Sequence, residues 1–535
     1  MPLQSANPYE PIELAQWPAG GINQSTRRST IGDQDLWWLE NYIPLAVGEL
    51  RSVWGPSAAI YTAPPGLTIC RIFFACLDGT NVYCYNFLSD GTIRAVNIAT
   101  GTVTNLLTAT WGPTTPPYYA SLKVWTPTQI GNTTGQIGGL LIGSPAGYYA
   151  VDANFTVTGP GQNAPNWLTG GALDPGGNPF PMPSGLPGIY SLEVYNQRMW
   201  VQGQTVHSFS APENGADFSA AGGGGSYPYN GDQLTISFND QCATAGFLYQ
   251  FGDSMIQWVS NIQALGQVAA STTPPSITNP YTTIFQLSNY NPQIGQRFPR
   301  PVGKWLQALT VFDLAGVYLI DGSGQTTWLT QKVTNTWVTL NPAPFIPTCC
   351  PVHIFGQRWL LFNGTFTDPW KVTRSFMMAW NGQIWIALSQ RYALTHINYW
   401  EQNSCITAYG TDGTSLYKLF AQPDNQLVKT IATKAYNGNN SLMIKNWKRA
   451  FVHMHDVAGQ PEGSFLNGEV TTMGGGVPNG SEQVSFEIKP TQDDLRPHPL
   501  AGAGIFAQLD LVGNSPDYII ERILLGFEDR TMYGA

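Results

Sequence analysis

The sequence predicts an all-β protein with a β-propeller-like central domain, an N-terminal arm and a C-terminal β-sandwich-like region. Hydrophobic residues make up 43% of the 535-residue chain and aromatic residues 12%, which is enough to bury sizeable cores. Helix-forming residues are scarce, whereas the β-favouring types Thr, Val, Ile, Tyr and Trp abound. Short apolar segments recur between Gly-, Asn- and Asp-containing turns. The length exceeds what one core normally organises, so we expect two or three domains.

Charge is unusually low. Asp, Glu, Lys and Arg together supply 11% of the residues, against about 25% in a typical soluble domain. The aromatic content argues against disorder, and no uninterrupted apolar run of 18 residues is present to span a bilayer. The net charge of −9 argues against a surface that grips nucleic acid, because such surfaces need clustered Lys and Arg. The same net charge is compatible with DNA that passes nearby without being bound.

Residues 1–60 are expected to form an arm and linker rather than part of a core. A turn is predicted at Gly20–Asn23, and the one plausible helical fragment spans Asp33–Glu40, where Trp37 and Trp38 are adjacent. The first residues lack the basic start and apolar stretch of a secretory signal. The cysteines, which show no metal spacing and fit no complete disulfide framework, indicate synthesis in a reducing compartment.

The first repeat of the propeller begins near Ile69. Asp78-Gly79 and Asp90-Gly91 are hairpin signals, since Gly accepts the positive φ of a tight turn. Four short strands are predicted around them, at 71–77, 81–87, 92–98 and from Val103. Four strands joined by hairpins form a meander, which is the unit of one propeller blade.

Similar meanders follow with a loose period of 40 to 60 residues, interrupted by Pro- and Gly-rich insertions at 157–187 and Ala221–Gly225. Radial repetition of four-stranded sheets explains such repeats better than a two-sheet sandwich, which rarely exceeds about 250 residues. We predict a propeller of six or seven blades over residues 61–420. The apolar segments that support it begin at Gly139, Gly147, Ser191, Arg198, Val206, Phe247, Ser254, Leu309, Gly316, Thr326, Arg358, Phe376, Gln383 and Ser415.

The composition changes in the last part of the chain, residues 421–535, where charged residues return. Alternating strand patterns are found at 449–455, 483–488, 506–512 and 518–525. These predict a small β-rich domain of sandwich type.

Propellers host glycoside hydrolases, but the sequence lacks the catalytic signatures of these enzymes. A sialidase Asp box needs Trp five residues after Asp, but Asp321 and Trp328 are seven apart, so a hairpin turn is the better interpretation. The acidic residues are scattered, and many lie in Asp-Gly turns that serve the backbone. Gly222–Gly225 is not followed by Lys-Ser/Thr and is interpreted as a flexible insertion. Nucleophile-elbow and Walker patterns are absent. We predict no catalytic residues, no cofactor site and no enzymatic activity.

His453 and His455, followed by Asp456, are the only histidine cluster. Strand periodicity would place both imidazoles on one face, so a metal pair is geometrically possible, but two ligands do not make a tight site. We expect partly exposed strand histidines and no bound metal. The cysteines are odd in number and show no metal spacing, and Cys349 and Cys350 are adjacent, so buried free thiols are expected. All seven are Cys70, Cys76, Cys84, Cys242, Cys349, Cys350 and Cys405.

Two stretches resemble a known family, the tail nozzle proteins of short-tailed bacteriophages, also called tubular tail protein B or packaged-DNA stabilisation proteins. The similar motifs are Gly20-Gly-Ile-Asn-Gln24, Asn41-Tyr-x-Pro44, Gly48-x-Leu-Arg51 with Gly55, Val194–Gly203, and Val206–Phe218. They cover the arm and about a third of the propeller.

The resemblance implies a structural virion protein in the tail, assembled in the bacterial host cytoplasm. Members of this family form a ring, usually hexameric, below the portal and adaptor proteins. They carry a propeller on the outside of a central conduit and hold or gate the genome until ejection, and needle, fibre or spike proteins are further partners. Genomic DNA passes through the channel without sequence-specific binding, and an acidic chain suits this because negative walls let DNA slide. The family has no catalytic residues to carry over, and the C-terminal region matches none of its motifs.

Two alternatives stay open. Another tail component, a fibre, spike or baseplate protein, is one, although no fibrous or collagen-like repeat is visible. A carbohydrate-active propeller enzyme is the other, since Trp and Tyr could line a sugar-binding face. Most aromatic side chains are nevertheless expected in the hydrophobic cores. A low-charge surface rich in Asn, Gln, Thr and Trp also fits burial against neighbouring subunits.

Overall fold

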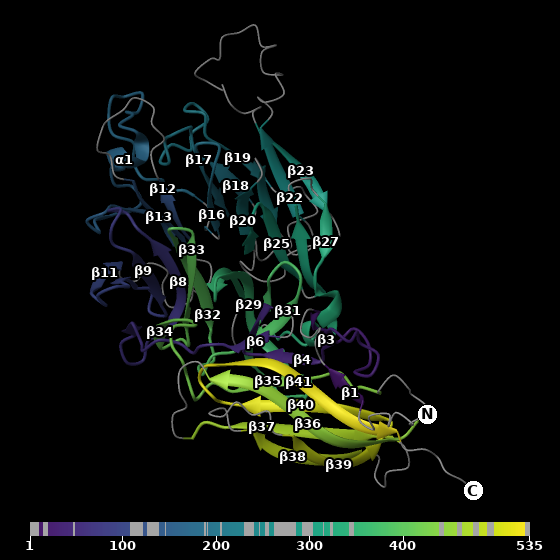
Figure 1. The fold of residues 1–535 in the computed structure, drawn as a ribbon. Helices are drawn as coiled ribbons and strands as arrows, with labels where there is room; N and C mark the ends of the chain where they lie inside the picture. The colour runs from purple at the N-terminus through teal and green to yellow at the C-terminus, as the bar shows by residue number, and fades with distance from the viewer. Residues whose placement is uncertain are drawn as a thin grey trace, which may run out of the picture.

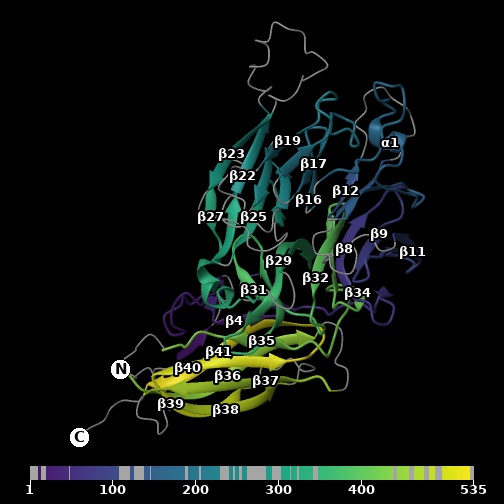
Figure 2. The ribbon, with the colours of Figure 1, turned by 180° about the vertical axis from the view of Figure 1, so that it is seen from behind.

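Seven groups of four antiparallel strands follow one another around the upper part of the computed structural model, and a β-sandwich lies beneath them (Figure 1). The view from behind shows the same two parts (Figure 2). The residues described are 10–13, 20–46, 49–107, 121–125, 138–144, 146–186, 189, 191–203, 206–228, 240–244, 247–251, 256–261, 285–291, 303–313, 315–321, 325–341, 347–437, 443–456, 463–474, 481–488 and 497–529.

Each group of four strands has the up-and-down order of a propeller blade, and within the described residues there are seven such groups. In chain order they are β8 (Ile69–Ala75), β9 (Tyr83–Leu88), β10 (Ile93–Asn97) and β11 (Val103–Leu107); β12 (Ser121–Trp125), β13 (Gly139–Ser144), β14 (Gly147–Val151) and β15 (Val157–Thr158); β16 (Ser191–Tyr195), β17 (Arg198–Gln202), β18 (Val206–Phe209) and β19 (Gly225–Pro228); β20 (Asp240–Thr244), β21 (Phe247–Phe251), β22 (Ile256–Asn261) and β23 (Phe285–Asn291); β24 (Gly303–Trp305), β25 (Ala308–Asp313), β26 (Gly316–Ile320) and β27 (Thr326–Trp328); β28 (Thr348–Ile354), β29 (Gln357–Thr367), β30 (Thr373–Trp380) and β31 (Trp385–Leu388); β32 (His396–Gln402), β33 (Cys405–Thr411), β34 (Ser415–Lys418) and β7 (Tyr61–Thr62).

The first strands of successive groups lie next to one another, as the inner strands of a propeller do. β12 contacts β16, β16 contacts β20, β24 contacts β28, β28 contacts β32 and β32 contacts β8. Apolar side chains fill the space between blades. Tyr85 and Phe87 of β9, for example, are fully buried in one cluster with Leu140 and Ile142 of β13. The all-β, propeller-like fold predicted from the sequence is confirmed.

The hairpins of the first blade form where the Asp-Gly pairs predict them. Gly79 and Gly91 have φ of 74° and 82°, which a residue with a Cβ rarely adopts. Asp78 Oδ1 accepts hydrogen bonds from the backbone N–H groups of Thr80 at 2.8 Å and Asn81 at 2.6 Å. The Asn81 side chain and these backbone donors lower the pKa of Asp78 to about 2. This carboxylate therefore serves the turn.

β7 closes the propeller, because it adds a strand from the start of the chain to the last blade. Tyr61 lies opposite Leu416 of β34 and Thr62 opposite Ser415. The backbone N–H of Ile60 donates to Leu416 O at 2.8 Å, and that of Ala63 donates to Thr414 O at 2.8 Å. The segment that leads into the first blade is thereby hydrogen-bonded to the last blade.

Helical structure in the described residues is limited to short segments, α1 (Asn166–Thr169), the 3-10 turn η5 (Thr330–Val333) and α2 (Thr334–Trp337). α2 follows η5 directly and places Trp337 in the main core, where its side chain is fully buried. Trp337 packs against Phe362 and Phe366 of β29 and Trp385 of β31.

The sandwich consists of two sheets. One has the order β39-β36-β41-β6-β5 with β1 beside β41, and the other contains β4, β35, β40, β37 and β38. Their bounds are β1 (Glu10–Glu13), β4 (Trp38–Glu40), β5 (Tyr42–Ala46), β6 (Glu49–Ser52), β35 (Lys429–Ala432), β36 (Lys445–Asp456), β37 (Leu466–Met473), β38 (Ser481–Ile488), β39 (His498–Gly504), β40 (Phe506–Gly513) and β41 (Tyr518–Asp529).

One nine-stranded sheet runs from the propeller into the sandwich, in the order β28-β29-β30-β31-β4-β35-β40-β37-β38. β4 is the junction: it pairs in parallel with the blade strand β31 and antiparallel with β35. A single hydrophobic cluster spans both parts and includes Trp359 of the blade, Trp38 of β4 and Trp447 of the sandwich. The two parts thus share both a sheet and a core.

The segment expected as an N-terminal arm is therefore built into the fold over its described residues. Trp38, Leu39, Tyr42, Ile43 and Leu50 are all fully buried. Besides β4 to β7, the short strands β2 (Gly21–Ile22) and β3 (Asp35–Leu36) pair in parallel with each other. The prediction of an arm is corrected because the strands that cover this segment come from distant parts of the chain.

The helical fragment predicted over Asp33–Glu40 is also wrong, since β3 and β4 occupy this range. A helix this short gains little from its own hydrogen bonds. Pairing on both sides of β4 provides a complete sheet environment for Trp38 and Leu39 instead.

Candidate functional site

An acidic cleft of about 660 Å³ lies where the propeller meets the sandwich. One wall is the turn between β29 and β30, and the floor is the polar face of the sheet formed by β4, β35, β40, β37 and β38. Its principal side chains are Glu40, Asp368, Trp370, Arg374, Asn467, Glu469, Glu487, Asp510 and Val512.

The registers of the floor strands explain why these polar groups share one face. Glu40 lies opposite Thr430, Thr430 opposite Val512, Val512 opposite Asn467, and Asn467 opposite Glu487. Directly opposed residues in an antiparallel pair point to the same side of the sheet. Two residues along, a second row contains Trp38, Ala432, Asp510, Glu469 and Ser485. The intervening row contains Leu39, Ile431 and Leu511, which are fully buried in the sandwich core.

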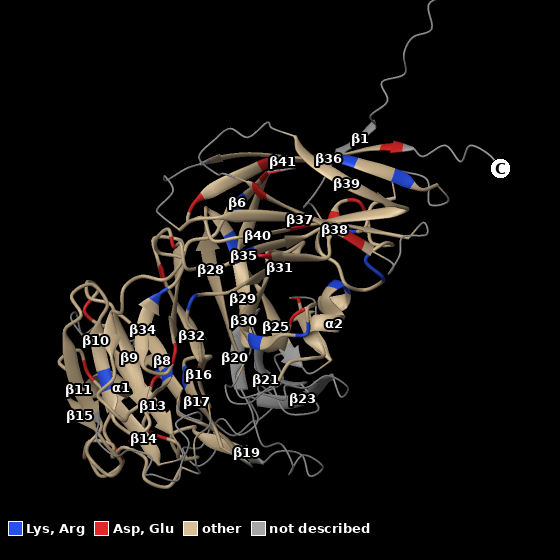
Figure 3. Ribbon diagram, turned by 90° about the horizontal axis from the view of Figure 1, so that it is seen from below, with Lys and Arg blue, Asp and Glu red and all other residues tan. Residues whose placement is uncertain are grey.

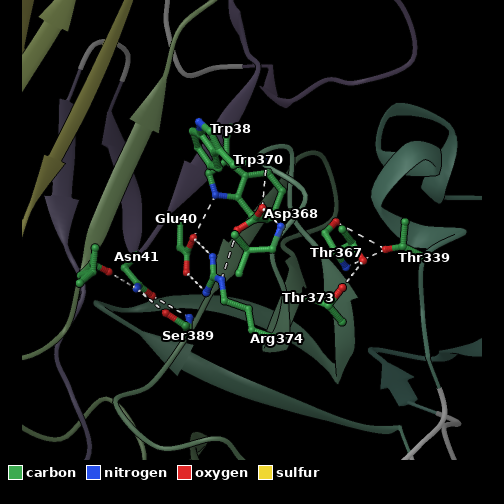
Figure 4. Close-up of polar contacts among 12 residues, drawn as sticks. Trp38, Glu40, Asn41, Thr339, Thr367, Asp368, Trp370, Thr373, Arg374 and Ser389 are labelled. Atoms are coloured by element: carbon green, nitrogen blue, oxygen red, sulfur yellow. Dashed lines mark hydrogen bonds and ion pairs between the residues drawn. The ribbon is translucent and has the colours of Figure 1, made fainter.

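Arg374 and Glu40 form a bidentate ion pair at the inner end of the cleft (Figure 4). Arg374 Nη1 donates to Glu40 Oε1 at 2.7 Å, and Nη2 donates to Oε2 at 2.6 Å. Trp38 Nε1 donates to the same carboxylate at 3.0 Å. The Glu40 side chain is only 5% exposed, so this carboxylate depends on its three donors. Burial lowers the pKa of Arg374, but the hydrogen bonds and charges of Glu40 and Asp368 outweigh it and leave the pKa raised.

Asp368 shapes the turn that forms the wall. Its Oδ1 accepts from the backbone N–H groups of Trp370 and Val372, each at 3.0 Å, while Arg374 Nε approaches Oδ2 at 3.4 Å. The base of the turn is tied by Thr367 and Thr373, whose hydroxyls lie 2.8 Å apart. Trp370 is consequently held in place at the cleft although its side chain is 45% exposed.

The cleft combines apolar surface with excess negative charge. Trp370 meets Trp38 edge to face, with ring centroids 6.4 Å apart, and Val512 on the floor is 37% exposed. Glu40 and Asp368 share one cationic partner, Arg374, and Asp510 pairs with Arg28. In the part of the chain that the structure describes, Glu469 and Glu487 have no ion-pair partner. A ligand with a positive group on an apolar stem fits this chemistry.

A second cavity, of about 260 Å³, lies among the inner strands of the propeller. Arg71, Lys123, Lys304 and Glu193 line it, and Lys123 Nζ pairs with Glu193 at 2.8 Å across two blades. This pair joins neighbouring blades.

The predicted histidine pair does share one face of β36, but both imidazoles are paired with the carboxylate of Glu521. Nδ1 of His453 lies 3.0 Å and Nδ1 of His455 2.7 Å from the two oxygens of Glu521 on β41. Among the described residues, no group of three or more His, Cys, Asp or Glu is arranged to hold a metal ion.

The cysteines with described side chains are free thiols. Cys84 and Cys350 are buried as expected, and burial raises the pKa of both. The other four differ from the prediction: Cys70, Cys76 and Cys349 are half-buried, and Cys405 is exposed. The side chain of Cys242 lies outside the described residues.

Asp321 lies at the turn between β26 and β27, where its Oδ1 accepts from the backbone N–H of Gln325 at 3.0 Å. Gly222–Gly225, expected as a flexible insertion, is packed: Arg198 Nη1 donates to Gly223 O at 2.6 Å, and Gly224 lies against the backbone of Phe218. The buried arginine thus fixes this loop.

The sequence alone does not indicate the cleft, because its residues come from six separated segments. The local signals were the Trp-Trp-Leu-Glu run ending at Glu40 and the Asp-Pro-Trp turn beginning at Asp368. Neither indicates a site until β4 is placed beside β31.

Comparisons with known proteins reveal similarity only at the level of folded shape. No family model and no curated protein sequence matches the chain. The solved structure of BBS1N in complex with ARL6DN aligns with a TM-score of 0.42 and 10% identity, over 69% of this chain and 98% of that one. PorZ, a surface component of the type-IX secretion system of Porphyromonas gingivalis, aligns with a TM-score of 0.30 and 8% identity, over 62% and 44%. Within the described residues, no helix is long and apolar enough to cross a membrane.

Proposed function

We propose that this chain is a structural virion protein that forms a ring at the distal end of a short phage tail. In this role it continues the DNA conduit, helps to retain the genome and then allows its release. The motifs at Gly20–Gln24, Asn41–Pro44 and Val194–Phe218, similar to those of tail nozzle proteins, are the basis for this assignment. Portal and adaptor proteins above, and needle, fibre or spike proteins nearby, are the partners proposed with it.

The observation that carries the proposal is the continuous sheet from propeller to sandwich. Domains joined by a linker can move independently. Here nine hydrogen-bonded strands and one hydrophobic cluster join the two parts, so they form a stiff unit. A subunit that transmits force along a tail needs such stiffness.

The low charge of the chain supports the same role. A surface poor in Lys, Arg, Asp and Glu loses little solvation when subunits bury it. The net charge of −9 also keeps the walls of a conduit from binding DNA tightly.

The test is the oligomeric state of the purified full-length protein. Mass photometry is expected to detect a species of six 58.3-kDa chains, and negative-stain microscopy a closed ring with a central opening. A protein that remains monomeric across the micromolar range, at low and physiological salt, contradicts the proposal. A trimer elongated along one axis would instead support a fibre or spike.

A further inference from the structure

The acidic cleft has a complementary feature on the same chain, a β-bulge on β36. The pairing of β36 with both β39 and β41 shifts register between Trp447 and Arg449. Trp447 and Ala450 are both fully buried, so the two residues between them, Lys448 and Arg449, both face outward. A bulge re-aims side chains in this way.

Lys448 and Arg449 project from the sheet opposite to the one that forms the cleft floor. In Figure 3 basic positions lie on β36 and acidic ones on β37 and β38. Arg449 is exposed, and Lys448 makes only a peripheral contact with Glu528, at 3.4 Å, with side chains 40% and 31% exposed. An exposed pair of this kind contributes little to stability, so Lys448 can change partners cheaply.

We propose that the cleft receives the Lys448–Arg449 bulge of a second copy of this chain, and that this contact builds the ring. The inference rests on the proposed function, because it specifies the interface of the proposed assembly. A contact between two different patches of identical subunits is heterologous, and heterologous contacts close into rings when the rotation allows.

The chemistry of both surfaces fits this occupant. The cleft offers Glu469 and Glu487 as carboxylates without an ion-pair partner among the described residues, and Trp370 as an exposed ring. A guanidinium or ammonium group stacks on the face of a Trp ring while its stem covers apolar surface. Trp and Arg are also the residues most enriched at the energetic centres of protein interfaces.

The opposite orientation of the two surfaces is the reason for proposing a second copy of this chain as the partner. Within one domain, the acidic face of one sheet and the basic bulge of the other point away from each other. Each subunit can therefore offer its bulge to one neighbour and its cleft to the other. Charge complementarity of this kind also sets orientation, because like-charged faces repel.

Charge reversal tests the contact directly. Glu469→Lys with Glu487→Lys, and separately Lys448→Glu with Arg449→Glu, are expected to leave the chain folded but to reduce ring formation at least tenfold in mass photometry. The matched controls Glu401→Lys and Lys418→Glu change exposed residues elsewhere and should assemble as the unmodified chain does. Circular dichroism and thermal melting confirm that each variant is folded.

The decisive experiment is an equimolar mixture of the two charge-reversed variants. Each lysine-bearing cleft then meets a glutamate-bearing bulge, and each unmodified cleft meets an unmodified bulge, so alternating rings are expected to form. Rings formed equally well by either variant alone, or no recovery in the mixture, would overturn the cleft–bulge contact while leaving the proposed ring standing. An unmodified chain that never assembles would overturn both.

Discussion

At the scale of single residues, the junction between propeller and sandwich buries several charged groups, although the chain as a whole is poor in charged residues. Glu40 and Asp517 are almost fully buried, and each is paired with an arginine. Lys429 is also buried, and its ammonium group donates to the carbonyl oxygens of Leu427 at 3.2 Å and Asp424 at 3.4 Å. Changes in the charge of these groups should therefore change the free energy of unfolding by a measurable amount.

Lys429 should produce a characteristic dependence of stability on pH. Burial lowers its pKa to about 8, partly offset by Asp424 and Asp517. Between pH 8 and the unfolded value near 10.5, the unfolded chain holds a proton that the folded chain has lost, so the free energy of unfolding rises with pH. The total rise is about 3 kcal/mol. Above pH 10, buried tyrosines such as Tyr148, whose pKa burial raises, act in the opposite sense.

Lys429→Met isolates this effect. Urea unfolding of the unmodified chain and the variant at several pH values gives a difference in which the tyrosine contributions cancel. We expect that difference to change by about 3 kcal/mol between pH 7.5 and 10.5, in favour of the unmodified chain at high pH. Lys418→Met, at an exposed position, should give a constant difference. A constant difference for Lys429→Met as well would refute the assignment.

Arg374→Met should destabilise the junction because it leaves Glu40 charged and buried. The expected loss in the free energy of unfolding is about 3 kcal/mol. Combining it with Glu40→Gln removes the unpaired charge, so the double variant should be more stable than Arg374→Met alone. Arg391→Met, an exposed arginine, serves as the control in the same urea titrations. Additive losses would mean that the pair is not coupled.

At the scale of elements, the propeller depends on a strand of two residues. Tyr61 of β7 is 8% exposed and belongs to the cluster that contains Leu416, Tyr409 and Val96. β7 has no partner strand besides β34 in its sheet, so side-chain packing and a few backbone hydrogen bonds hold the closure. Removing the aromatic ring of Tyr61 should therefore separate β7 from β34 before the rest of the propeller unfolds.

Tyr61→Ala is expected to lower the free energy of unfolding by about 3 kcal/mol, as large-to-small changes in aromatic cores do. Hydrogen exchange should locate the effect: amides of β34 lose protection, whereas those of β29 in the shared sheet keep theirs. Thr62→Ala, at the exposed neighbouring position, is the matched control. Equal loss of protection in β29 would show that the closure is not a separate unit.

The elements that could be predicted from the sequence are those whose partners are close in the chain. The hairpins at Asp78-Gly79 and Asp90-Gly91 needed only turn chemistry and alternation, and both are found. β4 could not be predicted, because its neighbours β31 and β35 lie more than three hundred residues away and nothing local shows that a Trp-rich run will be inserted between them. The cleft could not be predicted for the same reason, because Glu40 and Arg374 meet only after β4 is inserted beside β31.

At the scale of the whole molecule, the structure changes the meaning of the N-terminal segment. As an arm it would be an appendage free to reach a neighbouring subunit. As the source of β4 to β7 it joins the sixth blade, the last blade and the sandwich. We therefore assign the proposed contacts between subunits to surfaces of the finished fold, namely the cleft and the bulge on β36.

The insertion of β4 and β7 also has a consequence for how the chain acquires its structure during synthesis. Thr62 contacts Ser415 across 353 positions, and Arg28 contacts Asp510 across 482. The earliest strands to leave the ribosome are therefore among the last to find their partners, and contacts of such long range slow folding. Until then their apolar residues remain exposed to aggregation. We expect a nascent chain that ends before β35 to need chaperone protection, and the completed chain to lose that need.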